Sequence, residues 1–233
     1  MMEANTVSRE DWLAERLALL EQEKALTRQR DAVSDARRAL PRVKTDQDYQ
    51  FQSENGEVGL ADLFDGRSQL IVQHFIFGAD WNEGCKACSL MAENYDGVIP
   101  HLKQRDVSLV AISRAPLEKL LAFRNRMGWG FNWVSSLGSN FNADFDVGFT
   151  AEQVEGEVYY NYHLTKFPMT EAPGVSIFAL DSDGVVYHTY SCFGRGLDPL
   201  MGTYQYLDLV PKGRDEDNLS YGMEWVRHHD NYE

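Results

Sequence analysis

The stretch LIVQHFIF (residues 70–77), GADWNEG (residues 78–84) and CKAC (residues 85–88) decides the fold of this chain of 233 residues. Its first eight residues are almost all apolar, which is typical of a strand that is covered on both faces. After the loop, apolar residues recur with helical spacing as far as Ile99. The stretch therefore predicts a buried strand, one loop, and a helix that begins at Cys85.

The neighbouring segments extend this pattern in both directions. Upstream, Tyr49–Phe51 and Val58–Leu60 flank Asn55-Gly56, which is a strong hairpin signal. Downstream, Val107–Ile112 has the composition of a strand, and Leu117–Met127 has helical spacing. This alternation of strands and helices favours parallel strand pairing through right-handed crossovers.

The second half of the chain predicts an antiparallel ending. Residues 128–170 are rich in aromatic residues, Gly and Asn, and we expect them to form an insertion that packs beside the sheet. Val175–Leu180 and Val185–Tyr190 flank the turn Asp181–Gly184, which predicts a hairpin. A closing helix is expected over Asp198–Leu209. The pattern as a whole predicts an α/β sandwich with a mixed sheet.

The N-terminal segment predicts a long helix. Ser8 and Asp11 have capping-box spacing, and Pro41 ends the helical pattern. Only Ala36 is apolar at the second heptad position, which argues against a free-standing coiled coil. We expect the helix to pack on its own body or on a second subunit, which would make a homodimer. Its narrow apolar stripe repeats every seven residues: Trp12, Leu19, Leu26, Val33 and Leu40.

We therefore expect three parts: a helical arm at residues 1–41, an α/β domain at residues 42–210, and a tail at residues 211–233. The formal net charge is −14, from 36 acidic and 22 basic residues, which disfavours nucleic acid and anionic membrane surfaces as partners. No apolar run approaches the roughly 20 residues of a membrane span. The N-terminal residues do not have the pattern of a secretory signal, and three cysteines are too few for the disulfide framework of an extracellular protein. We therefore expect a cytoplasmic protein.

The cysteine pair is the main candidate for chemistry. Two thiols three positions apart at a helix start can form a disulfide, and nearby backbone N–H groups favour the thiolate of Cys85. We predict Cys85 as nucleophile and Cys88 as resolving thiol. Zinc is the rival, but only Cys192 remains as a further thiol and no histidine pair has metal spacing. We expect neither a metal nor a cofactor. The other hypothesis is a non-catalytic binding protein whose thiols take part in no reaction.

The position of the pair resembles that of the reactive dithiol in thioredoxin-like proteins, over roughly residues 49–209. The resemblance implies a mixed sheet flanked by helices, with the arm and the aromatic-rich insertion added. It also implies that Pro173 is a cis-proline that faces the dithiol. An ordinary proline in a turn is the alternative interpretation. Trp81, Pro173 and Arg114 are the candidate substrate-binding residues. Arg114 follows a strand at the sheet's carboxyl edge, where a salt-bridged surface arginine is the alternative.

The loop before Cys85 also resembles the peroxiredoxin layout, in which a loop after the same strand presents a peroxide-reacting cysteine. That loop carries a Pro and a Thr, whereas residues 80–84 contain neither, and Asn82 occupies the Thr place. Peroxidase activity is therefore the alternative activity. Thioredoxin itself has Gly-Pro between its cysteines, where this chain has Lys86-Ala87.

Nearly the whole chain is similar to a bacterial domain-of-unknown-function family within the thioredoxin-like superfamily. The members of that family are predicted to be dithiol–disulfide oxidoreductases. The resemblance implies thiol–disulfide exchange with a protein or small-molecule disulfide or thiol as substrate. Four segments carry it: Leu60–Cys88, Asp106–Pro116, Phe131–Phe145 and Gly196–Gly213.

Overall fold

The computed structural model describes residues 5–233, and the chain divides into two compact units, residues 1–41 and 42–233. The first unit is helix α1 (Arg9–Arg38), whose N-cap is Ser8. The Ser8 hydroxyl accepts a hydrogen bond of 3.1 Å from the Asp11 N–H, as the capping spacing predicted. None of the described helices is long and apolar enough to cross a lipid bilayer.

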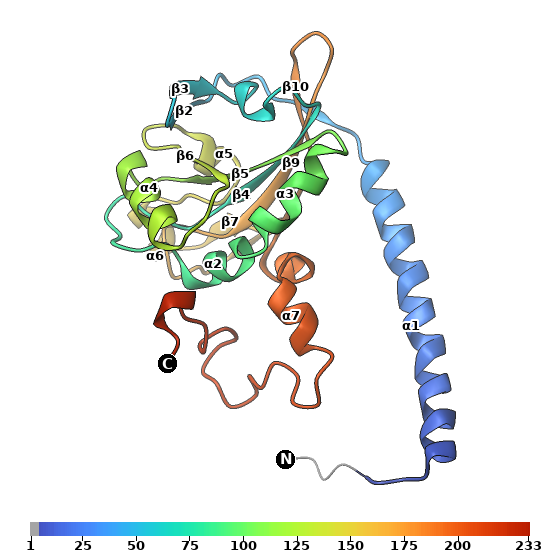
Figure 1. Cartoon of the computed structure of the whole chain (residues 1–233). Coiled ribbons are helices and arrows are strands. Elements are labelled where there is room, and N and C mark those ends of the chain that lie inside the picture. Colours follow the sequence, from blue (N-terminus) through green and yellow to red (C-terminus); the bar gives the residue numbers. More distant parts are fainter. Residues whose placement is uncertain (1–4) are drawn as a thin grey trace. The chain divides into compact units, whose positions relative to one another are not determined.

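The second unit contains a large sheet and a two-stranded one, with helices around the large sheet (Figure 1). The strands are β1 (Val43–Lys44), β2 (Gln50–Ser53), β3 (Gly56–Gly59), β4 (Gln69–His74), β5 (Val107–Ser113), β6 (Asn132–Ser135), β7 (Val158–Tyr160), β8 (His163–Thr165), β9 (Gly174–Leu180) and β10 (Val186–Phe193). The α-helices are α2 (Lys86–Ala92), α3 (Tyr95–Lys103), α4 (Leu117–Arg126), α5 (Phe141–Asp144), α6 (Ala151–Glu155) and α7 (Gly202–Leu207). The 3-10 helices are η1 (Asp62–Phe64), η2 (Gly194–Leu200) and η3 (His229–Asn231).

The large sheet has the strand order β1-β10-β9-β4-β5-β6-β2-β3. Strand β4 lies between β5, which is parallel to it, and β9, which is antiparallel. The hairpins β2–β3 and β9–β10 form as predicted. A βαβ half that contains α2 thus joins a ββα half, which is the thioredoxin-like arrangement.

The prediction that residues 128–170 pack beside the sheet is wrong for their first part. Strand β6 pairs in parallel with β5 inside the large sheet, and β2 pairs with it on the other side. Trp133 and Val134 are both buried, so this short strand is covered on both faces. Because β6 is only four residues long, its sequence does not show the alternation that identifies a strand. The remainder of the segment, with α5, α6 and the β7–β8 pair, lies outside the large sheet.

Two predicted helices are shorter than expected. The helix after Cys85 is interrupted at Glu93 and Asn94. There the Asn94 amide donates to the Met91 carbonyl at 3.3 Å, and such bonds compete with helix continuation. The closing helix α7 begins only at Gly202, after a 3-10 segment that contains Pro199.

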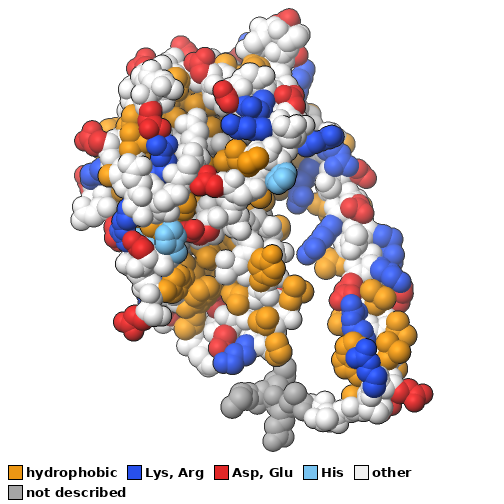
Figure 2. Space-filling model, in the orientation of Figure 1, with side chains coloured by type: hydrophobic (Ala, Val, Ile, Leu, Met, Phe, Trp, Pro, Cys, Tyr) orange, Lys and Arg blue, Asp and Glu red, His pale blue; other side chains and the backbone are white. Residues whose placement is uncertain are grey.

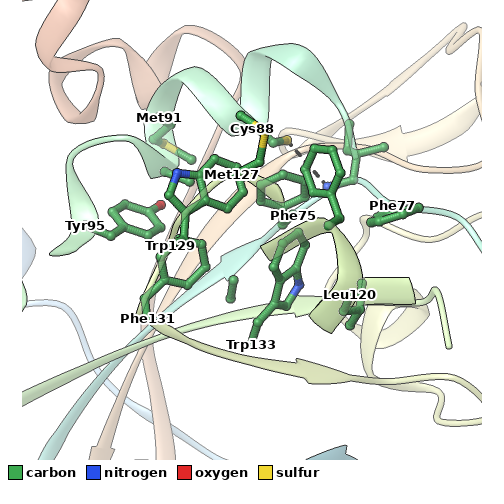
Figure 3. Packing of buried hydrophobic residues seen from close by; sticks show 14 of the residues in the cluster. Phe75, Phe77, Cys88, Met91, Tyr95, Leu120, Met127, Trp129, Phe131 and Trp133 are labelled. Atoms are coloured by element: carbon green, nitrogen blue, oxygen red, sulfur yellow. Dashed lines mark hydrogen bonds between the residues drawn. The ribbon is translucent and has the colours of Figure 1, made fainter. Parts of the chain in front are cut away.

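The sheet buries a separate hydrophobic cluster on each face. One cluster lies between the strands and helices α2, α3, α4 and α7, and Figure 3 shows its aromatic part around Phe75 and Trp133. The rings of these two residues lie 4.4 Å apart. Ser113 ties the cluster to the backbone, because its hydroxyl accepts from the Trp133 indole at 3.0 Å and donates to the Phe75 carbonyl at 2.6 Å. Segments η1 and α5 cover the other face.

A chain of polar side chains crosses this second face. The His74 Nε2 lies 2.8 Å from the Ser176 hydroxyl, which lies 2.7 Å from the Ser191 hydroxyl. The Nε2 of His188 lies 2.7 Å from the same Ser191 hydroxyl. Burial, with a smaller contribution from the charge of His188, lowers the pKa of His74 to about 3. The folded protein therefore holds a neutral His74 at neutral and mildly acidic pH.

We predict that His74 makes the fold acid-sensitive. Its pKa in the unfolded chain is about 6.5, so the unfolded state binds the proton first and stability falls as pH drops from about 6.5 towards 3. Between pH 7.5 and 5.0 this linkage removes about 2 kcal/mol. In His74→Gln that loss should shrink by the same amount, measured by urea unfolding at both pH values. The exposed His101→Gln is the control, and an unchanged loss in His74→Gln would contradict the prediction.

Candidate functional site

The backbone of Ile76 holds both cysteines. Its carbonyl accepts a hydrogen bond of 2.9 Å from the Cys85 N–H, and its own N–H donates to the Cys88 sulfur at 3.4 Å. Figure 3 shows Cys88 at the aromatic cluster, where it is 3% exposed. Cys85 is the N-cap of α2 and is only half-buried. Both sulfurs are free thiols. The pair thus has an accessible and a buried member, as the roles of nucleophile and resolving thiol require.

Gly84 lets the loop approach the core immediately before Cys85. A Cβ atom at this position would lie 2.7 Å from the Phe75 ring and 3.0 Å from the Phe123 ring. Both rings are buried in a packed cluster and have little room to move. Any side chain at Gly84 would displace the loop that positions the nucleophile.

The two thiols differ in acidity because one stabilises the other. A hydrogen bond from the Cys88 thiol, the backbone N–H groups of Ala87 and Cys88, and the charge of Lys86 lower the pKa of Cys85 to about 7, although burial acts against them. The same hydrogen bond raises the pKa of Cys88, and burial and the negative charges of Cys85 and Glu171 raise it further. One proton is therefore held on Cys88 while Cys85 is a thiolate near neutral pH.

A cleft of about 360 Å³ lies beside the loop that carries Cys85. Trp81 and Arg114 both line it, so the structure brings together two of the three predicted substrate-binding residues. The Trp81 ring packs over Gly78 and against the same hydrophobic cluster as Cys85. The other lining residues are Gly78, Ala79, Asp80, Leu137, Gly138, Ser139, Thr170 and Glu171.

Arg114 is ion-paired inside this cleft. Its Nε donates to the Glu171 carboxylate at 2.6 Å, and its Nη2 lies 3.4 Å from the Thr170 carbonyl. The Glu171 side chain is 3% exposed, whereas that of Arg114 is 32% exposed. Burial raises the pKa of Glu171, and the arginine partly offsets this effect. The arginine thus balances a buried carboxylate while part of its side chain remains accessible.

Pro173 differs from the expectation. No peptide bond in the described part of the chain is cis, so the bond before Pro173 is trans and the cis-proline prediction is wrong. The Pro173 carbonyl accepts a hydrogen bond of 2.8 Å from the Tyr160 hydroxyl. Its ring is not part of the cleft lining that contains Trp81 and Arg114.

The C-terminal tail supplies contacts that the sequence did not indicate. His228 is 1% exposed, and its Nε2 lies 2.9 Å from the carbonyl of Gly84, the residue before Cys85. Its ring packs edge-on against Phe123 at 5.1 Å. Arg126 links the same loop to the tail through ion pairs with Glu83 and Asp230. The tail therefore fastens the loop that leads into the dithiol.

His229 diverges from its neighbour and forms a separate contact. Its Nδ1 lies 2.7 Å from the carboxylate of Glu93, just after the end of α2. Neither histidine joins the cysteines in a metal site. Within residues 5–233, no three His, Cys, Asp or Glu side chains are grouped closely enough to hold a metal ion.

We predict that Cys85 is alkylated with a midpoint near pH 7, because its thiolate is stabilised by the Cys88 thiol above all. In Cys88→Ala this hydrogen bond is lost, and the midpoint should move upward by about a pH unit or more. The measurement is the rate of iodoacetamide modification against pH, with Cys192→Ala as background in every sample. Equal midpoints with and without Cys88 would show that the thiols do not interact.

We predict that His228→Ala destabilises the protein by about 1–3 kcal/mol, because a buried ring and its hydrogen bond to Gly84 are lost. The alkylation rate of Cys85 at pH 7 should also change, since the loop loses its fastening. The matched control is His229→Ala, which removes an exposed ion pair and should lower the free energy of unfolding by less than about 1 kcal/mol. Urea unfolding and alkylation are measured on both variants, and equal behaviour of the two would contradict the assigned role of His228.

Comparison with known proteins gives a family and distant structural likenesses. No curated protein matches this chain. A mutant of Xanthomonas campestris peroxiredoxin Q is 10% identical, with a TM-score of 0.46, and the match covers 72% of this chain and 98% of that one. Peroxidoxin BcpB from Mycobacterium tuberculosis is 16% identical, with a TM-score of 0.42, and the match covers 72% and 97%. A Chlorobium tepidum protein, named as a candidate thiol:disulfide interchange protein DsbE, is 12% identical, with a TM-score of 0.42, and the match covers 71% and 98%. The family described as a bacterial protein of unknown function (DUF899) matches residues 1–232, and this chain belongs to that family.

Proposed function

We propose that the protein is a thiol–disulfide oxidoreductase in which Cys85 and Cys88 exchange with a substrate disulfide. The observation that carries the proposal is the asymmetry of the pair. Cys85 is half-buried with its pKa lowered to about 7, whereas Cys88 is buried with its pKa raised. A thiolate near neutral pH is the attacking species in such an exchange, and the buried thiol lies where it can resolve the product.

The exchange proceeds in two displacements. The Cys85 thiolate attacks one sulfur of the substrate disulfide, forms a mixed disulfide and releases the other half as a thiolate. Cys88 then loses its proton, and its sulfur attacks that of Cys85, which releases the second half. The substrate gains two electrons and two protons, and the cysteines become a disulfide. In the cytoplasmic setting that we infer, a thiol reductant returns the pair to the reduced state.

The geometry explains why the second step follows the first. Two of the factors that hold the proton on Cys88 are the hydrogen bond to the Cys85 thiolate and the negative charge of that thiolate. Both disappear once the Cys85 sulfur is part of a mixed disulfide. The Ile76 N–H remains and stabilises a thiolate at Cys88. Attack by the first thiol therefore acidifies the second one.

We assign the cleft as the place where the substrate lies next to its disulfide. It adjoins the loop that ends at Cys85, and its wall combines the Trp81 ring with the accessible part of Arg114. A flat ring and N–H donors suit a peptide-like segment, which offers apolar surface and carbonyl acceptors. The Arg114–Glu171 ion pair leaves no net charge from these two residues, so a strongly charged substrate is not required.

Trapping tests the proposed reaction. Cys88→Ser should accumulate a mixed disulfide through Cys85, because the resolving step is lost while the attacking thiol remains. Glutathione disulfide and a disulfide-containing peptide serve as probes, and intact-mass spectrometry gives the adduct. Cys85→Ser should form none, and Cys192→Ser should behave like the unchanged protein.

A trapped adduct on Cys192, or no adduct in Cys88→Ser with either probe, would contradict the assignment. Hydrogen peroxide is included as a separate oxidant. If the dithiol is oxidised rapidly by peroxide but not by either disulfide, the peroxidase alternative replaces the exchange reaction.

A further inference from the structure

Helix α4 runs beside the loop of residues 78–84 and contacts it along one face. Its residues Lys119, Phe123 and Arg126 are three to four positions apart, which places them on the same side of the helix. The Phe123 ring lies next to the Cα atom of Gly84, and Arg126 is ion-paired with the same loop. Figure 2 shows basic and acidic side chains close together on the surface around α4. The helix thus supports the loop along its length.

Lys119 holds the first half of this loop. Its ammonium group donates hydrogen bonds to the Ala79 carbonyl at 2.8 Å and to the Trp81 carbonyl at 3.1 Å. These residues belong to a turn in which the Trp81 N–H donates to the Gly78 carbonyl at 3.1 Å. Hydrogen bonds from an ionised donor are roughly twice as strong as those between neutral groups. Two of them on one turn fix the orientation of its peptide groups.

The position of Lys119 is unfavourable for the helix itself. It is the third residue of α4, in the first turn, where the helix dipole favours an acidic side chain and disfavours a cation. The side chain is only partly exposed, and the loop carbonyls supply the acceptors that its ammonium group needs. A residue that opposes the preference of its own helix and is satisfied by a distant segment helps to arrange that segment.

The turn that Lys119 holds forms one wall of the substrate cleft, because Gly78, Ala79 and Trp81 all line it. The Trp81 ring packs so closely on Gly78 that a Cβ atom there would lie 3.0 Å from the Cδ1 and Nε1 atoms of the ring. Lys119 itself lines a separate cavity of about 240 Å³. It therefore acts on the cleft through the turn rather than by touching a substrate there.

We propose that Lys119 is a positioning residue that sets the orientation of Trp81 in the cleft, and so determines how well a peptide disulfide is bound. The inference rests on the proposed function, since it takes the cleft as the substrate site. A ring that is already held in place offers its flat surface without the entropy cost of ordering it on binding. The second half of the loop is fastened by other groups, Arg126 and His228. Lys119 therefore affects substrate binding and leaves the acidity of Cys85 unchanged.

Rates of oxidation of the dithiol by two disulfides test this role. A disulfide-containing peptide offers a backbone and side chains to the cleft, whereas 2-hydroxyethyl disulfide offers neither. Lys119→Met should lower the second-order rate constant for the peptide about tenfold, and that for the small disulfide by less than about twofold. Lys119→Arg keeps the charge and the donors, so it should restore the peptide rate to within about threefold. The control is Lys103→Met, at the exposed end of α3. The alkylation midpoint of Cys85 should be the same in all of these proteins.

A double-mutant cycle tests whether Lys119 acts through Trp81. Trp81→Ala should itself lower the peptide rate about tenfold, and adding Lys119→Met should lower it further by less than about twofold. Acrylamide quenching gives a readout that needs no activity. The fluorescence of Trp81, taken as the difference between each protein and its Trp81→Ala counterpart, should be quenched more readily in Lys119→Met. Far-UV circular dichroism checks that each variant is folded.

Three results would overturn the role of Lys119. They are losses that multiply in the double variant, Trp81 quenching that is equal with and without Lys119→Met, and an equal loss of rate with both disulfides. The last result would mean that Lys119 supports the whole loop rather than the cleft. If the unchanged protein is oxidised by neither disulfide, the proposed exchange reaction fails, and the quenching measurement alone decides whether Lys119 positions Trp81.

Discussion

The backbone of Ile76 is the point on which the site depends. It extends the direction of β4 from the middle of the large sheet, and one peptide carbonyl and one N–H of the same residue engage Cys85 and Cys88. Because backbone atoms of a buried segment have little freedom, the Cys85 backbone and the Cys88 sulfur are held in fixed positions beside the sheet. Both hydrogen bonds lie at the start of α2, where they connect its first turn to the end of the buried strand segment.

Burial of unequal degree turns this geometry into unequal chemistry. Cys88 lies against an aromatic cluster that excludes water, whereas Cys85 reaches the surface of the loop. A negative charge on Cys88 is therefore disfavoured while Cys85 is the thiolate. The Cys88 thiol keeps its proton and donates it in a hydrogen bond to Cys85, which lowers the pKa of Cys85. The same closed surroundings keep the Glu171–Arg114 pair together, since separating it would leave a buried carboxylate without a counter-charge.

Much of the fold could be predicted from local patterns. The apolar run at residues 70–77, the Asn55-Gly56 turn and the pair of strands around Asp181–Gly184 each carry their signal within a few residues. Strand β6 carried no such signal, because four residues do not establish a period and its pairing partner β5 lies some twenty positions upstream. The local sequence likewise could not predict whether the peptide bond before Pro173 is cis or trans, because the surrounding structure selects the isomer.

The sequence by itself determined that Cys85 and Cys88 stand together after a buried strand, because helical spacing places residues three apart on one face of a single turn. Only the tertiary structure decided which groups surround them. Arg114 meets Glu171 across 57 positions of the chain, and His228 reaches Gly84 across 144. Such contacts arise when the chain folds back and buries polar groups that need partners, and no periodicity within either segment encodes them.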